Sequence, residues 1–66
     1  MWFSHAKRLH NGDQVGVRKS ASGETSTVYA NVLNVYVDPA NPALLRFDVL
    51  TERGMYLTNL SHKSLV

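Results

Sequence analysis

The segment from Thr27 to Val37, which reads TVYANVLNVYV, constrains the fold most because its apolar phase changes once. Two sets of apolar residues alternate with other residues on opposite parities: Val28, Ala30 and Val32, then Leu33, Val35 and Val37. Side chains of a strand alternate between its faces, so both sets reach one core only if an extra residue is inserted near Val32 and Leu33. Such a β-bulge bends a strand and increases its twist. The pattern therefore predicts one long, sharply bent strand.

Short strands and tight turns are predicted on both sides of this segment. Val15 and Val17 alternate with Gln14 and Arg18, and Gly16 between the two valines indicates a close backbone approach or a second bulge. The prolines of DPANPA, residues 38–43, predict a rigid turn that no strand passes through. The remaining expected elements are a polar loop over 20–27, a strand carrying Leu45, Phe47 and Val49, a type I turn over 51–54 with Gly54 in the left-handed region, a strand over 55–60, a single helical turn over 61–64 and a very short last strand at 65–66.

The N-terminal segment WFSHAKRLH predicts a short helix. Trp2, Ala6 and Leu9 recur at helical spacing with Phe3 alongside, and Asn11-Gly12 supplies a stop signal. A helix of little more than two turns is not stable alone, so we expect it to dock on the strands as a lid. The preferred architecture is a small antiparallel barrel with this helix packed on it.

The size of the chain predicts one domain over residues 1–66, with the helix in 1–11 and the barrel in 12–66. A chain this short buries a modest core, and without cysteine it cannot be reinforced by disulfides or cysteine-bound zinc. Self-association is the remaining remedy, so a homo-oligomer is expected. A cytoplasmic location without membrane contact is expected, because no apolar run is long enough to span a bilayer.

The order of these features resembles the SH3-like small barrels of the KOW, Tudor and bacterial stand-alone kinds. The resemblance covers Gly12 to Val66 and depends on GDQVGV at 12–17, the polar loop, the bent second strand, TERG at 51–54 and the terminal helical turn. It implies an all-β, SH3-like antiparallel barrel with a strongly bent second strand and a short N-terminal helix.

A partial resemblance connects GDQVGVRKS with the plasmid-type, trimethoprim-resistant dihydrofolate reductases, which are tetramers of such barrels. Their pore depends on a Val-Gln-Ile-Tyr run in a late strand, whereas the nearest segment here, residues 55–58, reads MYLT and lacks the Gln. No catalytic residue transfers to this chain. A reductase of this kind is the third interpretation of its function.

The residue pattern predicts a protein that is not an enzyme and that holds no cofactor or metal. His5 and His10 would point to different sides of the helix, and His62 is far away in the sequence, so they make poor metal co-ligands. No pair of aspartates has the spacing of an acid–base couple, and neither a GxSxG elbow nor a phosphate-binding glycine loop occurs. The expected role is therefore binding.

Pairing the expected strands gives a core and an outer face. The hairpin around 38–44 places Val37 opposite Leu45, Val35 opposite Phe47 and Leu33 opposite Val49 on the inner face, with Tyr36 opposite Arg46 and Asn34 opposite Asp48 outside. The next hairpin pairs Val49 with Leu57 inside and Leu50 with Tyr56 outside. Tyr36 and Arg46 are expected to form a cation–π or stacking pair. The predicted core is Val15, Val17, Val28, Ala30, Val32, Leu33, Val35, Val37, Leu45, Phe47, Val49 and Leu57.

Two functional interpretations follow from the outer face. The first is a protein-binding or self-associating module, because contiguous exposed apolar residues mark interfaces; its predicted contact residues are Tyr36, Leu44, Leu50 and Tyr56. The alternative is binding of DNA or RNA, because barrels hold single strands with basic and aromatic side chains; its predicted contact residues are Arg18, Lys19, Tyr29 and Arg46. The formal charge of only +2 weighs against the alternative, since dedicated nucleic-acid binders carry denser basic clusters.

Overall fold

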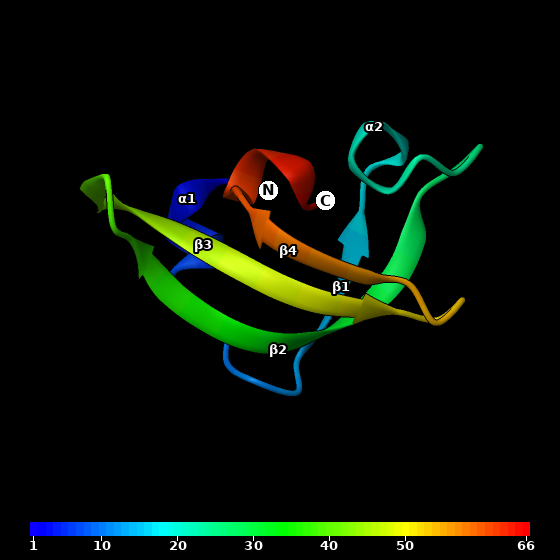
Figure 1. Cartoon of the computed structure of the whole chain (residues 1–66), viewed down its shortest axis with the longest axis horizontal. Coiled ribbons are helices and arrows are strands. Elements are labelled where there is room, and N and C mark those ends of the chain that lie inside the picture. The colour runs from blue at the N-terminus through cyan, green and yellow to red at the C-terminus, as the bar shows by residue number, and fades with distance from the viewer.

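Four antiparallel strands in chain order form the sheet of the computed structural model, which describes residues 1–66 (Figure 1). The strands are β1 (Gln14–Val17), β2 (Val28–Asp38), β3 (Asn41–Thr51) and β4 (Tyr56–Leu60); the helical turns are α1 (Phe3–Ala6), α2 (Lys19–Ser22) and the 3₁₀ turn η1 (His62–Ser64). The expected all-β class with a short N-terminal helix is confirmed. β1 and β4 are not paired with each other, so the sheet is open. None of the helices has the length and apolarity needed to cross a membrane.

The predicted bulge in β2 is present. Val32 pairs with Val49 and Asn34 pairs with Asp48, so Leu33 is the extra residue between them. The expected pairing of Leu33 with Val49 is therefore wrong by one residue, because the bulge absorbs Leu33 itself. The other expected pairs of both hairpins are observed: Val35–Phe47, Val37–Leu45, Tyr36–Arg46, Asn34–Asp48, Val49–Leu57 and Leu50–Tyr56. In Figure 1, β2 is the strongly curved green strand along the lower side of the sheet.

The core lies on the inner face of the bent sheet. Its nine buried apolar residues are Ala6, Val15, Val17, Val28, Ala30, Val32, Phe47, Val49 and Leu65, and Val35, Leu45 and Leu57 pack against them. Two predicted core residues are corrected. Leu33 is half-buried outside the cluster because it occupies the bulge, and Val37 is 51% exposed. β4 ends opposite Phe47, so beyond it β2 and β3 continue as a two-stranded ribbon and Val37 has little to pack against.

The N-terminal helix is shorter than predicted. Regular helix covers only Phe3–Ala6, and the chain continues through a turn. Ala6 and Leu9 pack on the core as expected, but Trp2 is 79% exposed. Trp2 precedes the helix with an extended backbone (ψ 144°), so its side chain leaves the helical stripe. The lid consists of Ala6 and Leu9 without Trp2.

Two connections also differ from their predictions. The polar loop contains α2, which Gly23 ends in the left-handed region (φ 76°), and within it Ser22 is buried. The turn after β2 is shorter than expected, because Asp38 pairs with Asn41 and β3 then runs through Pro42. Pro42 is tolerated because β3 has a neighbour on only one side there and an irregular pairing with β2.

The C-terminal residues close against β1. Val17 forms a bridge with Leu65, and the Val66 amide donates to the Gly16 carbonyl at 2.9 Å, which confirms the short last strand. A Cβ on Gly16 would lie 3.2 Å from Val66 Cβ, so this glycine marks a close approach and β1 has no bulge. The N-terminus lies beside this segment (Figure 1), since the Met1 amino group donates to the Leu65 carbonyl. Three segments distant in sequence therefore meet at one place.

Candidate nucleic-acid interface

Arg18 is the structural centre of the place where the two chain ends meet. It joins β1 to α2, and its amide donates to the Ser64 carbonyl at 2.9 Å. Its side-chain Nε donates to the Lys63 carbonyl at 3.0 Å, so both the backbone and the side chain of Arg18 are tied to η1. The structure gives no partner to its two terminal guanidinium nitrogens. A fixed, exposed cation with free donors is suited to binding an anion.

Two open hollows meet at Arg18. The first has a volume of about 580 Å³ and is lined by Met1, Trp2, His5, Arg18, His62, Lys63 and Val66. The second has a volume of about 450 Å³ and is lined by Arg18, Lys19, Ser20, Thr25, Ser26 and Thr27. We call the two together the basic groove. Its lining contains three Lys and Arg side chains and no Asp or Glu side chain.

Of the four Lys and Arg residues outside the groove, Lys7 and Arg8 form no ion pair, whereas the other two have carboxylate partners. Arg46 pairs with Asp38 at 3.0 Å, and Arg53 lies 3.9 Å from Glu24, so these two cations have carboxylate partners. None of the three cations of the basic groove forms an ion pair, since the only other charged contact joins His10 to Asp13. The small net charge of the chain therefore conceals a local excess of positive charge at the groove.

His62 fixes one wall of the groove. Its Nδ1 lies 2.8 Å from the Met1 carbonyl oxygen, which only accepts, so Nδ1 carries the proton. The Phe3 ring meets the imidazole edge-on, with centroids 5.6 Å apart. Partial burial, and secondly the charge of Arg18, lower the pKa of the Met1 amino group. The N-terminal residues are thus held in place beside Arg18.

The fold brings together only some of the residues that the sequence predicts to contact nucleic acid. Arg18 and Lys19 both line the basic groove. Tyr29 lies elsewhere, 56% exposed beside Leu50 and Glu52 in a small hollow of about 80 Å³. Arg46 is largely covered and turned toward Asp38. The structure therefore assembles half of this predicted set.

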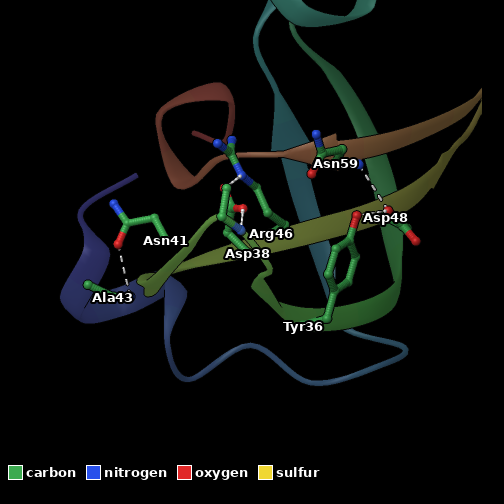
Figure 2. Close-up of polar contacts among 8 residues, drawn as sticks. Tyr36, Asp38, Asn41, Ala43, Arg46, Asp48 and Asn59 are labelled. Carbon is green, nitrogen blue, oxygen red and sulfur yellow. Dashed lines mark hydrogen bonds and ion pairs between the residues drawn. The ribbon is translucent and has the colours of Figure 1, made fainter.

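The expected contact between Tyr36 and Arg46 is absent, although the two residues are opposite in register. Figure 2 shows the guanidinium of Arg46 directed to Asp38 and the phenol of Tyr36 directed to Asp48. The Tyr36 hydroxyl donates to Asp48 Oδ1 at 2.9 Å, and the Asn59 amide donates to the same oxygen at 3.0 Å. Charged acceptors outcompete the weak attraction between a cation and a ring. Tyr36 and Arg46 thus stabilise the sheet.

These contacts shift the ionisation of three groups. Partial burial and then the hydrogen bond to Asp48 raise the pKa of Tyr36. Partial burial acts to raise the pKa of Asp48, but hydrogen bonds from the Asn59 amide, Tyr36 and Asn34 outweigh it and hold the pKa below its ordinary value. The Ala40 amide, followed by the Arg46 guanidinium, lowers the pKa of Asp38. Both carboxylates are therefore bound as anions.

The four residues of the predicted protein interface are also separated. Leu50 and Tyr56 are cross-strand partners with 39% and 55% of their surfaces exposed. Leu44 lies six residues from Leu50 along β3, which corresponds to about 20 Å in a strand, and it is half-buried. Arg46 and Asp48 lie between these two leucines along β3. Of the four predicted interface residues, only Leu50 and Tyr56 therefore form an exposed apolar pair.

Sequence reasoning missed Trp2 and Lys63 as groove residues. Lys63 joins Arg18 only because η1 lies against β1, and that contact spans 45 positions of the chain. Comparisons with family models, with curated proteins and with solved structures find no match to this chain. The basic groove and the Leu50–Tyr56 pair are the features from which a function is inferred.

Proposed function

We propose that this protein is a non-catalytic module that binds nucleic acid through its basic groove. The single observation that supports the proposal most is the meeting of Arg18 and Lys19 with the distant Lys63 around two adjoining hollows whose lining contains no Asp or Glu side chain. Unpaired cations in a concave surface attract a polyanion, because the surrounding low-dielectric walls focus their field. The serine and threonine hydroxyls of the second hollow add neutral hydrogen-bond partners for phosphate oxygens.

The SH3-like barrel is part of this proposal. It is supported by the order of the elements, by the bulge that bends β2, and by the bridge that brings Leu65 against Val17 after a 3₁₀ turn. Small barrels of this kind present concave, exposed surfaces to extended ligands. The groove beside α2 and η1 is such a surface.

The test is a double substitution of Lys19→Ala and Lys63→Ala, read by fluorescence anisotropy of a labelled oligonucleotide at several salt concentrations. Both side chains are exposed and form no hydrogen bond or ion pair, so folding is retained. Phosphate binding releases counterions, and each lost contact lowers the slope of log K against log salt by about 0.7 for a single strand. We expect weaker binding and a smaller slope in the double variant.

Lys7→Ala is the matched control, because Lys7 is exposed and lies outside the groove lining. It removes one positive charge, as each groove substitution does, so it separates a local contact from a general charge effect. Equal losses in the single Lys63→Ala and Lys7→Ala variants would contradict the proposal, as would wild-type binding that does not respond to salt.

A second candidate function is self-association through Leu50 and Tyr56. The specific observation is that these neighbours are both exposed, with Tyr29 and Met55 also 56% and 40% exposed nearby in the sheet and the turn. The outer edge of β4, which carries Tyr56, has no strand paired with it and contains no charged residue. Uncharged edges and apolar surface favour association with a second copy. Its test is the oligomeric state.

A further inference from the structure

Trp2 is the one large aromatic side chain at the basic groove that the fold leaves free. It is 79% exposed, the highest value among the exposed large hydrophobic residues, and it lines the same hollow as Arg18 and Lys63. The sequence contains a single tryptophan. A side chain of this size contributes strongly to a core when it is buried. Its exposure beside Arg18 and Lys63 therefore indicates a function in binding.

The backbone of Trp2 is fixed although its side chain is free. The Trp2 carbonyl accepts hydrogen bonds from the amides of His5 and Ala6, at 3.1 and 3.0 Å. The preceding residue, Met1, is held at both its amino group and its carbonyl by Leu65 and His62. Trp2 is therefore presented from an ordered segment, and little backbone entropy is lost when a ligand contacts its ring.

The surroundings of Trp2 select the chemistry of that ligand. A flat aromatic surface beside free cations matches a planar base attached to phosphates. Bases inside a duplex are stacked on each other and hide their faces, whereas an unpaired base exposes both. The hollow with Trp2 and the hollow with Lys19 meet at Arg18, so a strand that stacks on Trp2 can continue along the cations.

We propose that Trp2 stacks on an unpaired base, so that the ligand of the basic groove is single-stranded DNA or RNA. This inference rests on the proposed function and names its substrate class. Phosphates contact Lys63, Arg18 and Lys19, and the base stacks on the indole. Duplex DNA meets only the charges, and its binding is independent of Trp2.

The experiment titrates the protein with an oligothymidine of about 12 nucleotides, within the site sizes of single-strand-binding barrels. Since Trp2 is the only tryptophan, stacking quenches the whole intrinsic indole emission. Trp2→Ala is expected to weaken single-strand binding by about 5- to 150-fold, the effect of losing one stacked base. Trp2→Phe restores part of that affinity, and duplex binding changes in neither variant.

Tyr29→Ala is the control, because Tyr29 is an exposed aromatic outside the groove, and its affinity should equal that of the wild type. If Lys19→Ala with Lys63→Ala weakens binding but Trp2→Ala does not, the stacking inference is wrong and the proposed function stands. If neither oligothymidine nor duplex binds the wild type, both are wrong. Indole emission that responds to anionic phosphatidylglycerol vesicles but not to oligothymidine would overturn the inference in favour of a lipid surface.

Discussion

As anions, Asp38 holds β2 to β3, and Asp48 holds β3 to both β2 and β4. Asp38 Oδ2 accepts from Arg46, and Asp48 accepts from Tyr36 and Asn59 (Figure 2). Asp38 Oδ1 also accepts from the Ala40 amide, and Asp48 accepts from Asn34. Their pKa values lie below the ordinary value of 3.8. The unfolded chain therefore takes up protons first as the pH falls. The stabilisation is complete above 3.8 and is lost as the pH falls through the lower folded-state values.

We expect the melting temperature to fall as the pH is lowered from about 5 to about 2, and the fall to be shallower in Asp38→Asn with Asp48→Asn. Thermal unfolding followed by circular dichroism measures the slope. Glu52→Gln is the control, because the Glu52 carboxylate makes only one long contact, 3.5 Å from the Tyr29 amide. A slope in the double asparagine variant as steep as in the wild type would show that other groups control acid stability.

β4 contains a β-bulge opposite Asp48 of β3. Phe47 pairs with Leu60 and Val49 with Leu57, so Thr58 and Asn59 together face the single residue Asp48. Asn59 takes a left-handed backbone (φ 59°), and its amide donates to Asp48 Oδ1 at 3.0 Å. Asparagine and glycine adopt this conformation at low cost, whereas a β-branched residue does not.

Asn59→Val should therefore lower the free energy of unfolding by about 1–3 kcal/mol, while Asn59→Gly should change it by less than about 1 kcal/mol. Urea unfolding of the two variants beside the wild type measures both values. Thr58→Val serves as the control, since Thr58 is an exposed strand residue of the same bulge with ordinary backbone angles. An Asn59→Val variant as stable as Asn59→Gly would contradict a structural role for this backbone.

The two bulges show how far the sequence determines the sheet. The β2 bulge was predictable because six apolar residues change parity around Leu33. The β4 bulge was not, because YLTNL contains too few apolar residues to define a phase. The same limit applies to the site: Arg18 and Lys19 are adjacent in sequence, but Lys63 and Trp2 reach them only through packing between the chain ends. The alternation of apolar residues along one strand can be recognised in the sequence, whereas a contact between distant segments depends on the whole fold.

The distribution of charge over the molecule changes what the net charge of +2 implies. That value alone describes a weak field, yet the fold pairs Arg46 and Arg53 with carboxylates and leaves Arg18, Lys19 and Lys63 together without an Asp or Glu partner. Charges closer than the screening length of about 8 Å reinforce each other at physiological salt. A small net charge is therefore compatible with a local site for a polyanion.

The oligomeric state tests whether the exposed Leu50–Tyr56 pair is an interface between copies of the chain. We expect light scattering to show association that rises with protein concentration and persists at high salt, because apolar contacts are not screened. Leu50→Ser with Tyr56→Ser should shift the protein to monomer, whereas Val37→Ser, at an equally exposed apolar residue far along the hairpin, should not.

The groove substitutions Lys19→Ala and Lys63→Ala should leave this association unchanged, because the groove and the Leu50–Tyr56 pair share no residue. Conversely, Leu50→Ser with Tyr56→Ser should retain oligonucleotide binding per chain. A monomeric wild type at high micromolar concentration would remove self-association and leave the basic groove as the functional surface. Loss of association on raising the salt would instead place the contact between copies among the charged side chains.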